Sequence, residues 1–216
     1  MKKICFSDKY GLTQAVLEGK KVQTRRWVRL PKTFNGIPVR DFCKLTRLKD
    51  GAWNTYLCDE DEREIDGSSL PFPYERGERV AIAQRYSAIW DLSAEDVDCE
   101  QHQLKDGSIV HFNAVGVDNK MFVRADLMPN QIDIIDLDLQ HIQSITEEEC
   151  LMEGIVKGRC GSEDTHFMDA YYIPNDDQPY VTAKDAYSAL IDALYGKNTW
   201  DNNPWVWVIT FKLVKG

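Results

Sequence analysis

The sequence predicts an α+β fold in which a small β-barrel, or a strongly curved mixed sheet, is flanked by helices. Several short segments show the apolar runs or two-residue alternation of strands, few show helical spacing, and a strand-like segment ends the chain. The 216 residues, of which 43% are hydrophobic, are enough for one sizeable core. We therefore expect a single domain that spans residues 1–216 and carries insertions.

The N-terminal part is expected to be a strand over residues 2–6 followed by a helix. Ser7 has the side chain of a good helix N-cap, and Gly19 is the type of residue at which helices end. The basic stretch of residues 20–26 therefore begins where this helix stops, in a turn or loop.

The middle of the chain is less regular. Residues 31–73 are expected to form an insertion, because prolines and mixed polar residues leave little periodicity, and the Asp-Gly pair at residues 50–51 predicts a hairpin within it. The apolar run at residues 79–84 favours a buried strand. Two further strands are predicted at residues 108–115 and 120–125.

The clearest strand pattern covers residues 131–142, where apolar and polar side chains alternate. Two adjacent isoleucines at residues 134–135 break the alternation and predict a bulge. Thr146 and Glu149 then have the spacing of a capping box, so a short helix is expected to begin there and to end near Gly154.

The C-terminal part begins with a second expected insertion, residues 155–181. Thr182 is predicted to cap a helix that Gly196 ends, and residues 204–214 alternate as a final strand. The apolar face of the helix is expected to consist of Ala186, Ala189, Leu190, Ala193 and Leu194.

The charge is unevenly distributed. The formal net charge of -9 argues against a protein that coats nucleic acid non-specifically. Basic side chains gather between residues 20 and 49, whereas residues 59–66 are almost wholly acidic. One basic face on an acidic protein is therefore expected.

The cysteines and the hydropathy indicate the compartment. The six cysteines include no Cys-x-x-Cys pair, which is typical of core residues or free thiols in a reducing compartment. Cys99 and His102 have ligand-like spacing but no second pair, so we expect no metal and no organic cofactor. Neither a run of about 18 apolar residues nor a secretory signal is present, so a cytoplasmic protein with no membrane partner is expected.

The order of these features resembles the ASCH domains of the PUA-like superfamily. Members typically carry Gly-x-Lys-Thr-x-Thr-x-Arg near the N-terminus, which is similar to Gly-Lys-Lys-Val-Gln-Thr-Arg-Arg at residues 19–26. Tyr-Glu-Arg-Gly-Glu at residues 74–78, the segment 145–154 and Trp-Val-Trp-Val-Ile-Thr-Phe at residues 205–211 follow in the family's order. The likeness spans almost the whole chain and is greatest to the bacterial and phage-type forms that end in Asn-Pro-Trp-Val-Trp.

Two positions depart from the family pattern. Val22 stands where a threonine is common, and residues 83–86 read Ala-Gln-Arg-Tyr where many relatives have Arg-Glu-Thr-Trp. The first change leaves Lys21 and Thr24 in place. The second places Gln84 where many relatives have a glutamate, so a role for a carboxylate at this position is in doubt.

The resemblance implies a PUA-like fold and two kinds of function. Some small ASCH proteins are amidohydrolases that remove acyl groups from N4 of cytidine with a lysine, a threonine and a glutamate. By motif position these correspond to Lys21, Thr24 and Glu153. Other members of the superfamily are regarded as RNA-binding modules.

The chemistry of these residues agrees with that implication. Lys21 and Thr24 are three residues apart, so their side chains share a side only if the chain turns there. Burial beside Arg25 or Arg26 would lower the pKa of the lysine, which could then act as base toward Thr24 as nucleophile. Glu153 would protonate the departing amine, provided that burial raises the pKa of its carboxyl group.

Other residues are expected to hold the substrate. Arg25 and Arg26 suit phosphate contacts, Lys20 and Gln84 are assigned to substrate binding, and Tyr86 suits stacking on a base. Tyr86 suits a core position equally well. The alternative interpretation is that Lys21, Thr24 and Glu153 are not catalytic. In that case the lysine is exposed to solvent, the threonine bonds a main-chain amide in a turn, and the glutamate lies at an exposed helix end.

We therefore expect a protein that recognises a nucleoside or nucleotide and hydrolyses an exocyclic amide of the N4-acylcytidine type. A modified nucleoside or RNA is the expected partner. The alternatives are a non-catalytic RNA-binding module, and a phage or host protein that binds another protein through the insertions at residues 31–73 and 155–181.

Overall fold

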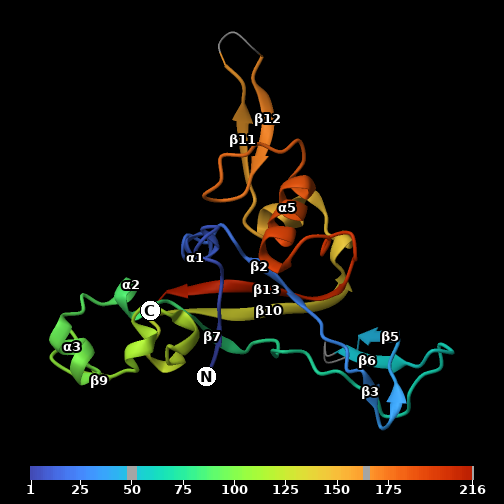
Figure 1. The fold of residues 1–216 in the computed structure, drawn as a ribbon, viewed down its shortest axis with the longest axis horizontal. Coiled ribbons are helices and arrows are strands. Elements are labelled where there is room, and N and C mark those ends of the chain that lie inside the picture. Colours follow the sequence, from blue (N-terminus) through green and yellow to red (C-terminus); the bar gives the residue numbers. More distant parts are fainter. Residues whose placement is uncertain (48–52, 163–165, 216) are drawn as a thin grey trace.

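The computed structural model describes residues 1–47, 53–162 and 166–215 and has an α+β fold (Figure 1). Its centre is a five-stranded mixed sheet in the order β1-β7-β10-β13-β2. β1 and β7 are parallel, and the other neighbours are antiparallel. The five strands are β1 (Lys2–Ile4), β7 (Arg79–Ile82), β10 (Asn130–His141), β13 (Trp205–Lys215) and β2 (Gln23–Trp27).

Four two-stranded hairpins and five α-helices complete the described part of the chain. The hairpin strands are β3 (Thr33–Phe34), β4 (Ile37–Pro38), β5 (Asp41–Arg47), β6 (Trp53–Cys58), β8 (Gln101–Gln103), β9 (Ile109–His111), β11 (Val156–Cys160) and β12 (Met168–Tyr172). The α-helices are α1 (Leu12–Leu17), α2 (Tyr86–Ile89), α3 (Ala94–Cys99), α4 (Glu147–Met152) and α5 (Ala183–Tyr195). Short 3-10 turns are η1 (Ala114–Gly116), η2 (Lys120–Phe122), η3 (Ala125–Leu127) and η4 (Ile142–Ser144).

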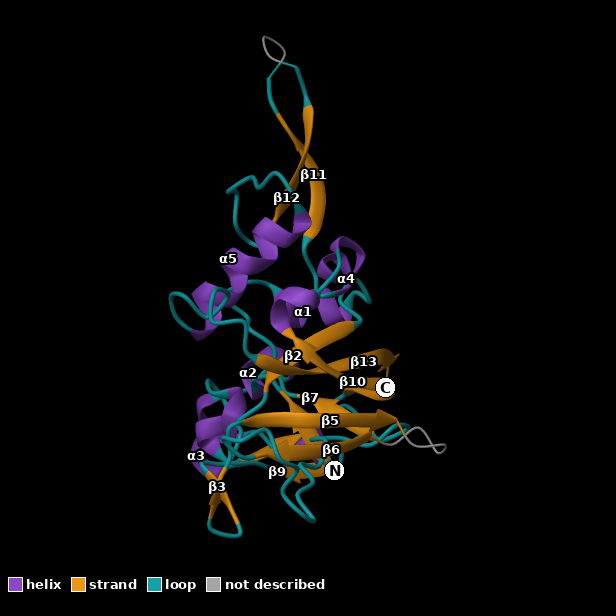
Figure 2. Ribbon diagram, turned by 90° about the vertical axis from the view of Figure 1, so that its right-hand side faces the viewer, coloured by secondary structure: helices purple, strands orange, loops and turns teal. Residues whose placement is uncertain are grey.

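The sheet is open within the described residues, because β1 and β2 are its two edges and do not pair with each other. The α+β class and the mixed sheet agree with the prediction, whereas the strand pairing among the described residues closes no barrel. Helices α1, α4 and α5 lie together on one side of the sheet (Figure 2). The hairpin β11–β12 projects away beyond α5 (Figure 1).

Two hydrophobic clusters hold these layers together. The larger one joins the central sheet to α1, α4 and α5 and includes Val16, Ile209 and Leu190. The smaller one packs around Tyr86 and Phe112 in the part of the chain that contains α2, α3 and β9. No helix in the described residues is long and apolar enough to cross a membrane.

Local sequence signals predicted several elements correctly. The long strand is β10, and its register against β13 shifts between Ile134 and Asp136, which confirms the predicted bulge. The capping box of Thr146 and Glu149 is present at the start of α4. The side chain of Thr182 accepts the main-chain N–H of Asp185 and so caps α5.

The predicted strand at residues 120–125 is wrong, and the one at residues 108–115 is reduced to the short β9. Residues 120–122 form the 3-10 turn η2 because the side chain of Asn119 accepts the N–H of Met121. The side chain of Asn113 holds η1 in the same way. Such local side-chain bonds compete with strand pairing.

The N-terminal helix also begins later than predicted. Its N-cap is Gly11, with φ 61°, and no side chain caps it, so Ser7 does not have the expected role. Residues 8–11 form a turn in which the N–H of Gly11 donates to the main-chain oxygen of Asp8. The predicted end at Gly19 is correct, with φ 73°.

The hairpin in the first insertion and the buried face of α5 agree with the predictions in part. β5 and β6 pair as the expected hairpin, although residues 50–51 lie outside the described residues. In α5 the buried face is rotated from the predicted one, because it follows the packing of α5 on α4 and leaves Ala193 exposed. Its buried residues are Ala183, Ala186, Tyr187, Leu190 and Ile191.

Candidate active site

The end of α1 places Lys21 in the interior. The N–H of Gly19 donates to Val16 O and the N–H of Lys20 donates to Ala15 O, both at 2.9 Å, which closes the helix with a left-handed glycine. The N–H of Lys21 also donates to Ala15 O, at 3.0 Å. This local geometry turns the chain inward, and the Lys21 side chain is only 2% exposed.

Thr24 and Arg25 lie on an edge strand of the sheet. Residues 23–27 form β2, in which Thr24 pairs with Ile209 and Arg25 with Val208. The expected turn is therefore confined to the residues before β2, because pairing with β13 makes residues 23–27 extended. Lys21 precedes the strand, so it is free of the strand's alternation and can share a cavity with Thr24.

Glu153 reaches the same place from the end of α4. It is the C-cap residue of that helix, and Gly154 follows it with φ 105°. The N–H of Val22 donates to Met152 O at 2.9 Å, which fixes the two distant segments side by side. Glu153 is 4% exposed.

Lys21 and Glu153 form a buried ion pair. Lys21 Nζ lies 2.5 Å from Glu153 Oε2 and 2.6 Å from the main-chain oxygen of Glu153. One lysine thus contacts both the side chain and the backbone of its partner. The pair is the centre of the candidate site.

Arg25 completes a buried charge network around this pair. Its Nη1 donates to Glu153 Oε1 at 3.1 Å and to Gln23 Oε1 at 2.7 Å, and its Nη2 lies 3.0 Å from Glu149 Oε2. Gln140, with its amide oxygen turned toward the guanidinium, accepts from Arg25 at 2.7 Å. The guanidinium is fully occupied by the protein, with a side-chain exposure of 1%.

Burial controls the protonation of Lys21. Loss of solvent is the largest effect and lowers the pKa of its amine below the ordinary value of 10.5. The carboxylate of Glu153 opposes this shift, and the neighbouring cations Arg26 and Arg25 add to it. The lysine is therefore easier to deprotonate than a surface lysine.

Thr24 has a hydroxyl that the protein leaves without a partner. Its side chain is 5% exposed and lines the same cavity as Lys21 and Glu153. Within residues 1–47, 53–162 and 166–215, Thr24 Oγ1 makes no hydrogen bond, whereas every fully buried side-chain polar atom there has a partner. The hydroxyl is therefore open to the cavity and available to a ligand.

The cavity has a volume of about 190 Å³ and lies between β2, the ends of α1 and α4, and α5. Its α5 wall was not predicted, because the sequence does not show which elements α5 covers. The one signal in the sequence was Tyr187, a residue with a polar hydroxyl on the otherwise apolar face of α5. The wall consists of Tyr187, Leu190, Ile191, Leu194 and Tyr195.

The remaining predicted site residues are dispersed. Arg26 lines the cavity, lies over the Phe6 ring at 5.5 Å and donates to the main-chain oxygen of Cys5. Lys20 has a side chain that is 70% exposed, pairs with Glu18 and does not line the cavity.

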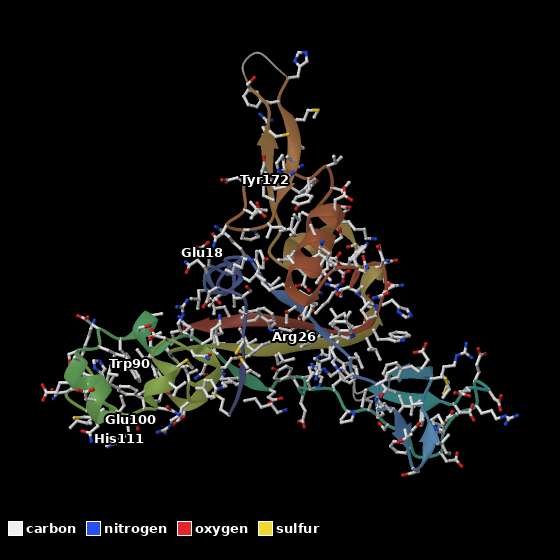
Figure 3. All side chains as sticks on the ribbon, in the orientation of Figure 1. Glu18, Arg26, Trp90, Glu100, His111 and Tyr172 are labelled. Atoms are coloured by element: carbon white, nitrogen blue, oxygen red, sulfur yellow. The ribbon has the colours of Figure 1, made fainter. Side chains whose placement is uncertain are left out.

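Gln84 and Tyr86 lie away from the cavity. Gln84 lines a different hollow and accepts from Asn130 at 3.0 Å. Tyr86 is fully buried and stacked on Trp90 at 4.8 Å, so it is a core residue in this structure and not a surface for stacking a base. Figure 3 shows Arg26 at the centre of the molecule and Trp90 in the part that contains α2 and α3.

In the described part of the chain, no group of three or more His, Cys, Asp or Glu side chains is placed to hold a metal ion. The chain matches no protein-family model, no curated protein and no solved structure.

Proposed function

We propose that this protein is a PUA-like ASCH amidohydrolase that removes the acyl group from an acylated exocyclic amine of the N4-acylcytidine type. The observation that carries the proposal is the convergence of Lys21, Thr24 and Glu153 on one cavity, with the threonine hydroxyl unbonded. A hydroxyl nucleophile beside a lysine of lowered pKa is a recognised arrangement for acyl transfer.

The first step forms an acyl-enzyme. The neutral amine of Lys21 takes the proton of the Thr24 hydroxyl, and Oγ1 bonds to the acyl carbon. The bond between that carbon and N4 then breaks, while the carboxyl group of Glu153 gives its proton to N4. The cytosine amine leaves, and the acyl group stays on Thr24.

The second step hydrolyses the acyl-enzyme. The ammonium of Lys21 first returns its proton to the carboxylate of Glu153. Water then bonds to the acyl carbon as the neutral amine of Lys21 takes one of the water protons, and the bond between that carbon and Thr24 Oγ1 breaks while the carboxyl group of Glu153 protonates the departing oxygen. The products are the carboxylic acid and the free hydroxyl. Each step leaves an ammonium and a carboxylate, which is the ion pair described above.

The ion pair and the reactive form differ only in where one proton lies. Moving that proton along the 2.5 Å contact from Lys21 Nζ to Glu153 Oε2 creates the neutral amine and the carboxylic acid together. No proton from solvent is needed. This relation explains how one buried pair can supply both the base and the acid.

The rate is expected to depend on pH as a bell, because turnover needs one shared proton on the pair. A pair that carries two protons has no base, and a pair that carries none has no acid. Burial lowers the pKa of Lys21, so the alkaline fall should begin below 10.5. Measurement of kcat/KM against pH tests this, and a rate that still rises at pH 10.5 would contradict it.

The cavity size limits what enters. At about 190 Å³ it is smaller than the roughly 300–1,000 Å³ of drug-sized pockets, so it suits an acyl group with part of a base better than a whole nucleotide. Arg26 is the lining cation that remains partly accessible. We assign to it the contact with the rest of the substrate.

A non-catalytic RNA-binding module would use the same residues differently. Of the two arginines expected to contact a phosphate, Arg25 is not available, because its guanidinium is bound to Glu149, Glu153 and Gln23. The buried position of Arg25 therefore argues against phosphate binding by this residue and leaves Arg26 as the arginine that could make such a contact.

The proposal is tested by incubating the protein with N4-acetylcytidine and following the ultraviolet absorption as cytidine forms. We expect turnover by the wild-type protein, loss of turnover in Lys21→Met, and unchanged turnover in Lys105→Met, whose lysine is exposed and does not line the cavity. Absence of turnover in the wild-type protein, together with salt-sensitive RNA binding, would overturn the enzyme in favour of the binding module.

A further inference from the structure

Tyr187 on α5 is a second cavity-lining hydroxyl that the protein leaves unbonded. Its side chain is 1% exposed and lines the same cavity as Thr24 and Lys21. Among the described residues its hydroxyl has no hydrogen-bond partner. In the described residues, every side-chain polar atom that is fully buried has a hydrogen-bond partner. Since the Tyr187 hydroxyl has none, its oxygen is not fully buried, and we infer that it faces the cavity.

The unbonded hydroxyl distinguishes Tyr187 from Tyr86, the other tyrosine that is almost completely buried. Both tyrosines are almost completely buried, but the Tyr86 hydroxyl accepts the N–H of Arg124 at 2.8 Å. Buried tyrosines usually find such a partner. Tyr187 is held firmly, with its ring edge-to-face on Trp200 at 6.2 Å, yet its hydroxyl is left for something that enters the cavity.

The other buried polar groups of the cavity are already engaged. Lys21 and Arg25 both bind Glu153, and Arg25 also binds Gln23 and Glu149. Thr24 is the proposed nucleophile. Of the buried polar side chains that line the cavity in the described chain, Tyr187 is thus the donor that remains.

The charge state of Tyr187 suits a donor. Burial, the largest effect, raises the pKa of its hydroxyl well above the ordinary value of 10.0, and the nearby Glu153 raises it further. The hydroxyl therefore keeps its proton across the neutral range. It can donate a hydrogen bond without giving up the proton.

We propose that Tyr187 is a further catalytic residue, whose hydroxyl donates a hydrogen bond to the carbonyl oxygen of the substrate's acyl group. Negative charge develops on that oxygen when Thr24 bonds to the acyl carbon, and a fixed donor stabilises this charge more than it stabilises the ground state. The assignment rests on the proposed function and adds to it the group that stabilises the oxyanion. It also sets the ligand class, an acylated amine with a carbonyl oxygen directed toward α5.

The test is Tyr187→Phe, which removes the hydroxyl and keeps the ring. We expect kcat for N4-acetylcytidine to fall about a hundredfold, as for loss of one oxyanion donor, and KM to rise by a smaller factor, because the weaker hydrogen bond to the uncharged carbonyl is lost as well. Tyr180→Phe, at a partly buried tyrosine outside the cavity, should leave kcat unchanged. A Tyr187→Phe protein with wild-type kcat would overturn the assignment, as would a fall in kcat that Tyr180→Phe reproduces.

A binding measurement separates this assignment from the proposed reaction. In a Thr24→Ala background, calorimetry should show that Tyr187→Phe weakens binding of N4-acetylcytidine but leaves cytidine, which has no acyl carbonyl, unaffected. If the wild-type protein turns over nothing but this difference is found, the reaction is wrong, and what stands is the hydrogen bond from Tyr187 to the acyl carbonyl of a bound ligand. If turnover occurs and neither binding nor kcat responds to Tyr187→Phe, the assignment is wrong and the reaction stands.

Discussion

Thr24→Ala is expected to abolish turnover of N4-acetylcytidine while the protein remains folded. The hydroxyl is the proposed nucleophile, and loss of a nucleophile typically lowers kcat by at least about a thousandfold. The free energy of unfolding should change less than is usual for a substitution at a buried position. Thr24 Oγ1 makes no hydrogen bond in the described structure, so its removal leaves no polar group without its partner. Steady-state kinetics and urea unfolding measure the two effects on the same preparation.

Thr24→Ser is the matched control for this result. It keeps a hydroxyl at the same place on β2 and should retain part of the activity, since serine can form the same acyl bond. Equal activity in Thr24→Ala and the wild-type protein would remove Thr24 from the reaction. A Thr24→Ala protein that unfolds would instead show that the hydroxyl is structural.

Glu153→Ala is expected to give the largest loss of stability. Its carboxylate lies between Lys21 Nζ at 2.5 Å and Arg25 Nη1 at 3.1 Å, and all three side chains are at most 5% exposed. Removal of one partner of a buried ion pair typically costs about 3–5 kcal/mol, because the remaining charge has neither water nor a counterion. Urea unfolding at neutral pH measures the change in the free energy of unfolding.

The control for Glu153→Ala replaces the whole pair. Lys21→Met/Glu153→Leu fills a similar volume without charge and should recover much of the lost stability, while it remains inactive. Arg25 keeps its contact with Glu149 in that variant. If Glu153→Ala unfolds at the same urea concentration as the wild-type protein, the buried ion pair is not formed in solution.

Local signals explain why parts of the fold could be predicted. A capping box such as that of Thr146 and Glu149 is satisfied within four residues, so the sequence alone determines it. The bulge at Ile135 and the helix end at Gly19 are local in the same sense. The open edges of the sheet depend on how distant strands pair, and no short pattern contains that information.

In the candidate site, too, some features could be predicted from the sequence and others could not. Lys21, Thr24 and Glu153 could be selected by the order of motifs, and the structure brings them to one cavity. Arg25 was expected to grip a phosphate, but its partner Glu153 lies 128 positions along the chain, and no local pattern reveals that contact.

The most direct test of the central claim is peptide mass mapping of protein quenched in acid during turnover of N4-acetylcytidine. The proposed reaction predicts an acetyl group on Thr24, present in the wild-type protein and absent from Lys21→Met, in which the base is missing. Turnover that proceeds with no acetyl group on Thr24, or with the acetyl group on another side chain, would contradict it.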